Sequence, residues 1–581
     1  MKDFLKYLLA TIIGIILASL IMFFIFLGTI SVLISRQDKP VEIRDNSILV
    51  IKLDNPVSDR KPLLLFSYAR TLGLNEILLN ISKAKEDKKI KGIYLEPSII
   101  PAGLATIEEI RNAILDFKES GKFVICHSDF YSQTSYYLAT AADKIYMNPE
   151  GLIPLLGLRA QLIFFKGTLE KLGIKPEIIR HGKFKSAVEP LMYDKMSDEN
   201  REQISKLIGS IWDYMISEIS ARRGITVEKI NYLADNLEIW DAKSTIEHNL
   251  IDSLAYKDYV LDKLKELTGT DKSKKLNLVS LSKYTKVPGA RKHKGLAKNK
   301  IAVIYASGTI QLGDEGEGQI SSERISKTIR KARLDSTIKA IVFRVNSGGG
   351  SNVASEVIWK ELNLARQVKP VIASFGDVAA SGGYYISVPA DTIVASKNTI
   401  TGSIGVWGVL LNMKKFLNEK LGITMDVEKT NRYSDFMSGY RSLSAKEREV
   451  MQNHVDNIYN TFVTHVSDGR NMNYDEVDKI GEGRVWSGIN AKEIGLIDIY
   501  GGLTTAIDIA VDKANVEKYR IIELPKLEDP IQQILKELTG NVSSVFLKKE
   551  LGNSYKHYKL IKEVVNLNGV QARMPFEIEI Y

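Results

Sequence analysis

At 581 residues the chain is long enough for several domains, and its hydrophobic content of 44% and charged content of 26% are ordinary for globular protein. Its net charge of +9 is spread along the chain, without the basic stripe that typifies nucleic-acid binding. The single cysteine, Cys126, excludes an intrachain disulfide and a cysteine-based zinc site. The seven histidines lack metal-ligand spacing, so we predict no metal, no cofactor and no nucleic-acid partner.

The N-terminus carries a long apolar stretch. Residues 7–35 contain no charged side chain, and these 29 residues exceed the roughly 20 that a helix needs to cross a bilayer. The stretch is also longer than the roughly 7–15-residue apolar region of a cleaved signal peptide. We therefore predict a transmembrane anchor within residues 1–36. Basic residues flank it on both sides, so charge does not indicate its orientation (Lys2, Lys6, Arg36, Lys39 and Arg44).

Strand and helix patterns alternate after a short polar tether. The predicted strands cover 47–53, 90–95, 123–126 and 144–147, and the predicted helices cover 74–84, 105–119 and 135–141. Such alternation favours an α/β fold with a mainly parallel sheet covered by helices. A further helical arm is predicted over 199–224, and the lysine-rich stretch 270–299 predicts a linker or a mobile loop.

The same pattern then starts again. The segment IxKAxxDxxIK that begins at Ile81 recurs at Ile329, and the Tyr136-Tyr137 pair recurs at Tyr384 with the same offset of 248 residues. This indicates an internal duplication of about 200 residues rather than a short solenoid repeat. We expect two domains of one fold, covering 47–269 and 300–527, followed by a C-terminal tail over 528–581.

One turn in the second copy carries a candidate nucleophile. The stretch FGDVAASGGYY, residues 375–385, predicts a buried strand, a tight turn and a helix that begins at or just after Ser381. Such a turn exposes the hydroxyl and directs free backbone N–H groups toward it. Small residues here can also serve close helix packing alone. However, the first copy has Gln133 opposite the serine and keeps the tyrosine pair, so packing does not require the serine.

A serine hydroxyl needs a base, either a histidine or a lysine whose pKa is lowered by burial. The first copy carries GKFKSAVEP, residues 182–190, in which Lys185 aligns with Ser434 of the second copy. The neighbours of Lys185 are apolar enough for partial burial, although most lysines are surface charges (Phe184, Ala187 and Val188). Lys185 is therefore the candidate base.

A glycine-rich loop follows the predicted strand 340–344. In VNSGGGS, residues 345–351, consecutive glycines let backbone N–H groups approach a reacting carbonyl, and the Gly382 amide could supply a second donor. A phosphate cradle and a plain flexible turn are the alternatives. The loop lacks the GK[ST] ending of a nucleotide-binding P-loop, so nucleotide binding is the weaker of these.

Four motifs in this order resemble bacterial signal peptide peptidase A, or protease IV, in its long, duplicated, membrane-anchored form: GKFKSAVEP, VNSGGGSNVASE, GDVAASGGYYIS and TGSIGVWG. The resemblance extends from the N-terminal anchor to the closing stretch VQARMPFEIEI. It implies two tandem ClpP/crotonase-like domains with helical arms after one transmembrane helix, and a bowl-like homotetramer.

The resemblance also assigns roles to residues. It implies a Ser/Lys dyad assembled across the two domains, with Ser381 as nucleophile and Lys185 as general base. Ser403 of the TGSIG motif would hydrogen-bond the lysine, and the amides of Gly349 and Gly382 would form the oxyanion hole. This chain has Gly348 where the family usually has proline, which raises backbone freedom at a cost of about 0.4–1 kcal/mol.

The expected function is that of a membrane-bound serine endopeptidase that degrades cleaved signal peptides and other apolar peptides. The resemblance places it in the bacterial inner membrane as a single-pass protein with its catalytic domains on the periplasmic side. Three alternatives stay open: a membrane scaffold on a decayed hydrolase fold, a crotonase-type acyl-CoA enzyme, and an α/β-hydrolase that uses a downstream histidine (His454, His465 or His557).

Overall fold

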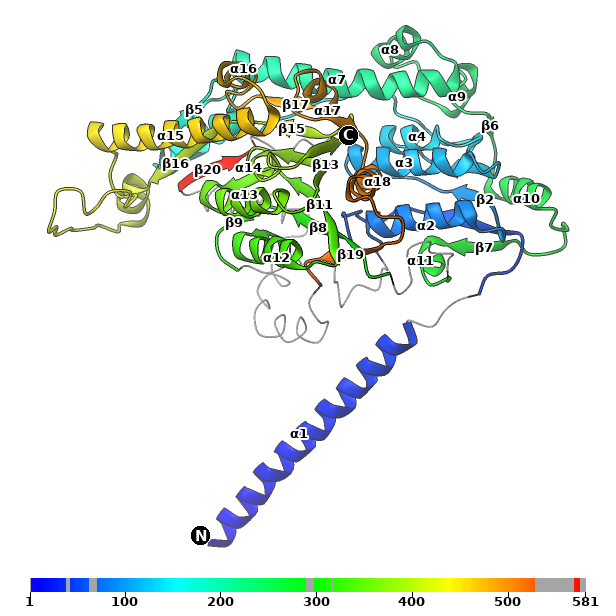
Figure 1. Ribbon diagram of the computed structural model, residues 1–581, viewed down its shortest axis with the longest axis horizontal. Coiled ribbons are helices and arrows are strands. Elements are labelled where there is room, and N and C mark those ends of the chain that lie inside the picture. The colour runs from blue at the N-terminus through cyan, green and yellow to red at the C-terminus, as the bar shows by residue number, and fades with distance from the viewer. Residues whose placement is uncertain are drawn as a thin grey trace.

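The computed structural model describes residues 2–37, 42–61, 71–288, 297–314, 318–527 and 569–574. Helix α1 (Lys2–Gln37) projects from a body of packed sheets and helices (Figure 1). Its segment Asp3–Met22 has a mean hydropathy of 2.3 and is fully exposed, and it is the one helix in the described part of the chain that is long and apolar enough to cross a membrane. The predicted N-terminal apolar helix is therefore present.

The first half contains a six-stranded, entirely parallel sheet in the order β6-β4-β3-β2-β1-β7. Its helices cover both faces with apolar stripes. The strands are β1 (Ser47–Ile51), β2 (Ile90–Leu95), β3 (Phe123–Ser128), β4 (Lys144–Met147), β6 (Ser253–Leu254) and β7 (Asn277–Ser280). The helices before and between them include α2 (Leu74–Glu86), α3 (Leu104–Lys118) and α4 (Gln133–Ala139). This is the predicted alternation.

The stretch 270–299 differs from the expected linker. Residues 277–280 form β7, which pairs in parallel with β1, and Val279 is buried in the core of the first half. Helix α11 (Leu281–Tyr284) follows directly. The lysines that suggested a linker lie around a short apolar strand, so composition concealed the strand. Residues 289–296 lie outside the described part of the chain.

The second half repeats the succession. Its main sheet has the order β17-β15-β13-β11-β8-β19, with β14 and β18 attached to β13. The strands are β8 (Lys300–Ser307), β11 (Ile338–Ser347), β13 (Val371–Ala380), β14 (Thr392–Ala395), β15 (Ile400–Gly402), β17 (Val485–Ser487), β18 (Ile499–Tyr500) and β19 (Arg520–Leu524). Helices α12 (Ser322–Leu334) and α13 (Asn352–Arg366) occupy the places of α2 and α3. The tandem α/β architecture predicted from the internal duplication is therefore confirmed.

The two halves share buried contacts. Helix α18 (Leu503–Ala514) of the second half packs into the same apolar cluster as the first sheet. Arg344, fully buried on β11, donates hydrogen bonds to Asp59 and to Glu109 of the first half, each at 2.7 Å. A buried guanidinium needs such partners, because an unpaired charge in the interior costs several kcal/mol. These ion pairs fix one half against the other.

A third sheet joins segments from distant parts of the chain, in the order β10-β9-β12-β20-β16-β5. Its strands are β5 (Lys175–His181), β9 (Ile310–Gln311), β10 (Ile320–Ser321), β12 (Gly349–Ser351), β16 (Val406–Asn412) and β20 (Gly569–Arg573). Strand β5 of the first half pairs antiparallel with β16 of the second. The first copy therefore reaches into the second copy just before Lys185.

Long helices frame this region. The arm predicted over 199–224 is α7 (Asp198–Arg223), capped by the Ser197 hydroxyl, and its counterpart is α15 (Ala445–Arg470), capped by Ser444. Figure 1 shows α7 running along one edge of the molecule. The remaining helices are α5 (Lys166–Leu172), α6 (Glu189–Met192), α8 (Val227–Asp235), α9 (Ala242–Glu247), α10 (Lys257–Thr268), α14 (Gly382–Tyr385), α16 (Tyr474–Ile480) and α17 (Gly488–Glu493), with short turns at Ser186–Val188 and Phe416–Lys420.

Candidate active site

Ser381 lies in a strained turn between β13 and α14. Its backbone φ of 54° and ψ of −118° are unusual for a residue with a side chain. Two hydrogen bonds hold the turn: the Ser381 N–H donates to the Gly402 carbonyl at 2.8 Å, and the Ser381 carbonyl accepts from the Tyr385 N–H at 2.8 Å. The helix begins directly after the serine, as the sequence predicted. The Ser381 residue is fully buried.

Lys185 reaches this serine from the other half of the chain. It follows β5 and precedes the turn at Ser186–Val188, and its whole side chain is buried. The Nζ atom lies 2.8 Å from Ser381 Oγ, 3.0 Å from Ser403 Oγ and 3.0 Å from the Ser403 carbonyl oxygen. Three residues singled out in the sequence thus meet at one point, although 196 residues separate Lys185 from Ser381.

The surroundings of Lys185 favour its neutral form. Its three hydrogen-bond partners are two hydroxyls and a carbonyl, none of them charged. Burial lowers the pKa of Lys185 well below its usual value, because the ammonium form loses its hydration without gaining a counter-charge. A neutral amine has a lone pair that can accept a hydroxyl proton. The arrangement can therefore activate Ser381 without histidine.

Close backbone approaches hold the lysine in place. A Cβ at Gly483 would lie 2.5 Å from Lys185 Cβ, and a Cβ at Gly405 would lie 3.1 Å from Lys185 Cδ. On the other side, Gln203 of α7 donates from Nε2 to the Phe184 carbonyl at 2.9 Å. None of these three supporting residues was predicted from the sequence. Only Gly405 had an available signal, since it belongs to the TGSIG motif that contains Ser403.

Gly349 and Gly382 lie side by side next to the serine. Gly349 has a φ of 101°, and a Cβ there would fall 2.7 Å from the Gly382 backbone nitrogen. Only glycine allows this approach without a clash. Gly382 opens α14, where backbone N–H groups have no partner within the helix. The Gly349 N–H donates to Ser347 Oγ at 3.1 Å in this structure, and that hydroxyl donates onward to the Gly308 carbonyl.

The histidines lie in other settings. His465 stacks on Trp359 with ring centroids 3.7 Å apart, and its Nε2 lies 3.2 Å from Glu356 Oε2. Among the described residues, the Ser381 hydroxyl forms its side-chain hydrogen bond with Lys185. His557 lies outside the described part of the chain. The geometry therefore favours the lysine over a histidine as the base.

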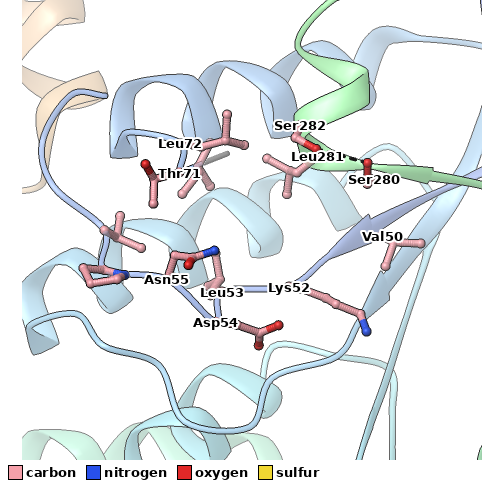
Figure 2. A pocket seen from close by; sticks show the side chains of 13 residues that line it. Val50, Lys52, Leu53, Asp54, Asn55, Thr71, Leu72, Ser280, Leu281 and Ser282 are labelled. Carbon is pink, nitrogen blue, oxygen red and sulfur yellow. Dashed lines mark hydrogen bonds between the residues drawn. The ribbon is translucent and has the colours of Figure 1, made fainter. Parts of the chain in front are cut away.

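A hollow on the first half lies elsewhere in the fold. It is lined by the residues after β1, by Thr71 and Leu72, and by the start of α11 (Figure 2). Its lining includes Lys52 and Asp54 but neither Lys185 nor Ser381. This hollow is therefore separate from the serine–lysine pair.

Comparison with known proteins agrees with this geometry. The model of peptidase family S49 matches twice, over residues 116–271 and 363–517, once in each half. The chain belongs to peptidase family S49. As a member of S49 it is a serine peptidase, and the two matches show that the internal duplication joins two S49 domains in tandem.

Several named proteins align with most of this chain. "Serine protease SPPA, chloroplastic" of Arabidopsis thaliana is 34% identical over 92% of this chain and 78% of its own length. "Protease 4" of Salmonella typhi is 36% identical over 81% of this chain and 77% of its own length. "Protease 4" of Haemophilus influenzae is 34% identical over 85% of both chains. The similarity to this S49 peptidase thus covers most of the length of each relative rather than a single domain.

Proposed function

We propose that this S49 peptidase is a membrane-anchored endopeptidase that hydrolyses cleaved signal peptides and other apolar peptides through a Ser381–Lys185 dyad. The observation that carries the proposal is the 2.8 Å hydrogen bond between the buried Lys185 Nζ and Ser381 Oγ. The similarity to proteins named Protease 4 and SPPA supports peptides as substrates. The apolar helix α1 would hold the enzyme at the membrane, where signal peptides remain after cleavage.

The first half of the reaction forms an ester. Neutral Lys185 takes the proton of the Ser381 hydroxyl while Oγ attacks the peptide carbonyl carbon. The negative charge that develops on the carbonyl oxygen is stabilised by the backbone amides of Gly349 and Gly382. The Lys185 ammonium then gives its proton to the departing amine, which leaves Ser381 as an acyl ester.

The second half of the reaction restores the serine. Neutral Lys185 takes a proton from the water molecule that attacks the ester carbon. The bond between that carbon and Ser381 Oγ then breaks, and the Lys185 ammonium returns the proton to Oγ as the carboxylic acid departs. The Ser403 hydroxyl and carbonyl oxygens both accept hydrogen bonds from Lys185 Nζ. In the neutral amine these two bonds direct the lone pair of the nitrogen toward Ser381. They also stabilise the ammonium form during its brief existence in a site without a carboxylate partner.

Location and assembly belong to the same proposal. The enzyme would lie in the bacterial inner membrane as a single-pass protein, with its catalytic halves on the periplasmic side, and would assemble as a homotetramer. Several large apolar side chains between Met413 and Leu443 are exposed, which suits a subunit contact (Leu421, Ile423, Met425, Val427 and Met437). Protease accessibility in spheroplasts and the mass of the detergent-solubilised protein test these two features.

The dyad is tested on the purified full chain in detergent with a synthetic signal peptide. We expect Ser381→Ala and Lys185→Ala each to lower kcat by at least about a thousandfold, because each removes a group that takes part in bond formation. The control is Lys183→Ala, since the Lys183 side chain is 60% exposed and pairs with Glu482. Hydrolysis retained in either dyad variant would rule out this mechanism.

A further inference from the structure

The turn between α16 and β17, residues 481–484, contacts two loops of the candidate site. On one side its Glu482 carbonyl accepts a hydrogen bond at 3.0 Å from the N–H of Phe184, the residue before Lys185. On the other side its last carbonyl accepts from the Ser403 N–H at 2.7 Å. Because the turn is bonded to both loops, it fixes the spacing between the candidate base and the serine that accepts from its amine.

The turn meets the lysine loop backbone to backbone. Its residues Glu482 and Gly483 have positive φ values of 49° and 84°. A Cβ at Gly182 would lie 2.3 Å from the Glu482 carbonyl oxygen, just as a Cβ at Gly483 would lie 2.5 Å from that of Lys185. A residue with a side chain, such as Glu482, adopts this left-handed conformation only where its surroundings impose it. The close fit that buries Lys185 therefore depends on the contacts that hold the turn.

Tyr459, on α15, holds the turn through its hydroxyl. The residue is 1% exposed, and the hydroxyl accepts from the Glu482 N–H at 3.1 Å and donates to Asp478 Oδ1 at 2.6 Å. The His181 ring at the end of β5 stacks on the Tyr459 ring, with centroids 3.9 Å apart, and its Nδ1 lies 2.7 Å from Asp456 Oδ1. Figure 1 shows α15, α16 and β5 together at one end of the molecule. One buried side chain thus contacts both the turn and the strand that leads to the candidate base.

We propose that Tyr459 is a positioning residue for the base: its hydroxyl holds the turn 481–484, and the turn holds the Lys185 amine against Ser381 and away from water. This inference rests on the proposed function, in which Lys185 acts as the base. Tyr459 does not touch the reacting atoms and acts only through the turn. Without its hydroxyl the Glu482 N–H loses its acceptor, and the turn is free to move away from the lysine loop. Water then reaches the ammonium form of Lys185 and stabilises it.

The pH profile of kcat/KM tests this role in the purified full chain with a synthetic signal peptide. Better hydration of the ammonium raises the pKa of the base, so Tyr459→Phe should move the acid limb of the profile upward by about one pH unit. Because only the neutral amine is active, hydrolysis below the limb should fall about tenfold and recover at higher pH. The variant leaves in place the nearest charged and titratable groups around the ring, which are His181, Asp456, Asp478, Glu482 and its ion-pair partner Lys183.

Two other tyrosines serve as controls. Tyr136→Phe removes a buried hydroxyl that donates to the Leu250 carbonyl at 2.6 Å in the core of the first half, so it should lower stability without moving the acid limb. Tyr474→Phe removes an exposed hydroxyl that bonds to Asn460 Oδ1 at 2.8 Å, and it should change neither. An unmoved acid limb in a folded Tyr459→Phe chain, or an equal shift in Tyr136→Phe, would overturn the proposal.

Hydrogen exchange tests the contact without catalysis. In Tyr459→Phe we expect the amides of Phe184 and Ser403, which are both bonded to the turn, to exchange at least about tenfold faster than in the wild type. In Tyr136→Phe they should exchange at the wild-type rate. Unchanged exchange of both amides in Tyr459→Phe would overturn the proposal. Hydrolysis retained in Lys185→Ala would instead contradict the proposed function, and the exchange result would still decide whether Tyr459 holds the turn.

Discussion

Thr106 donates two hydrogen bonds to the carboxylate of Asp377, from its backbone N–H at 2.9 Å and from its hydroxyl at 2.7 Å. Thr106 belongs to α3 of the first half, and Asp377 lies on β13 four residues before Ser381. Asp377 is half-buried, and the partial loss of hydration raises the pKa of its carboxyl group. The first half thus holds the strand that ends at Ser381, through a group that is costly to leave unpaired.

Thr106→Val should therefore weaken the fold close to the active site. The substitution keeps the shape of the side chain but removes the hydroxyl donor, and a hydrogen bond to a charged group contributes about 1.5–3 kcal/mol. We expect the free energy of unfolding to fall by that amount in urea titrations followed by tryptophan fluorescence. Thr461→Val is the matched control, since its exposed hydroxyl bonds only to the Asn457 carbonyl within the same helix. Equal losses in both variants would contradict this role for Thr106.

Ser403→Ala should impair catalysis without abolishing it. The Lys185 amine keeps the Ser403 carbonyl and Ser381 as partners, but it loses one acceptor that orients it. One hydrogen bond of about 1 kcal/mol corresponds to a five- to tenfold change in rate. We expect kcat to fall by roughly tenfold with KM unchanged, whereas Ser438→Ala at an exposed site should behave as wild type. A higher KM at full kcat would point to substrate binding instead.

Local patterns were enough to predict most of the fold. The strands at 90–95 and 144–147 have the predicted bounds, and the predicted arm differs from α7 by one residue at each end. Each of these elements carries an apolar run or stripe of its own. The strand at 277–280 was missed because four residues flanked by lysines carry too little periodicity, and pairing with β1 supplies its stability.

The site was predictable where the two copies differ. Ser381 and Lys185 each stand where the other copy has an unrelated residue, and the structure brings both together with Ser403. The residues that hold Lys185 in place could not be predicted. Gln203 and Gly483 contact the segment around Lys185, and these segments are far apart in sequence. The insertion of β20 between β12 and β16 also depends on long-range pairing. No short-range pattern encodes such pairing.

Gly349→Ala should abolish activity for reasons of space rather than strain alone. An alanine Cβ would collide with the Gly382 nitrogen at 2.7 Å and would enter the space that the Ala572 oxygen occupies. We expect peptide hydrolysis to fall at least a hundredfold, as when one oxyanion donor is lost. Gly121→Ala is the control, because Gly121 also has a positive φ, 76°, but an added Cβ there meets nothing within 4 Å. Comparable losses of activity in both would show that strain, not space, is responsible.

Replacing Lys185 by methionine should change how stability depends on pH. The pKa of Lys185 is lowered in the folded protein, whereas a lysine in the unfolded chain titrates near 10.4. Between those two values the unfolded state binds more protons, so the wild type becomes more stable as pH rises, by up to about 1.4 kcal/mol per pH unit. Methionine binds no proton, and the stability of the variant relative to wild type should therefore decline from pH 7 to pH 10.

Urea titrations at several pH values measure this difference directly. The hydrogen bonds that methionine loses to Ser381 and Ser403 add an offset that does not vary with pH, so the slope alone reports the buried amine. Lys183→Met is the matched control: its side chain is 60% exposed, and the stability difference from wild type should change little over the same range. A flat difference for Lys185→Met would mean that Lys185 stays protonated in the folded enzyme, which is incompatible with its action as the base.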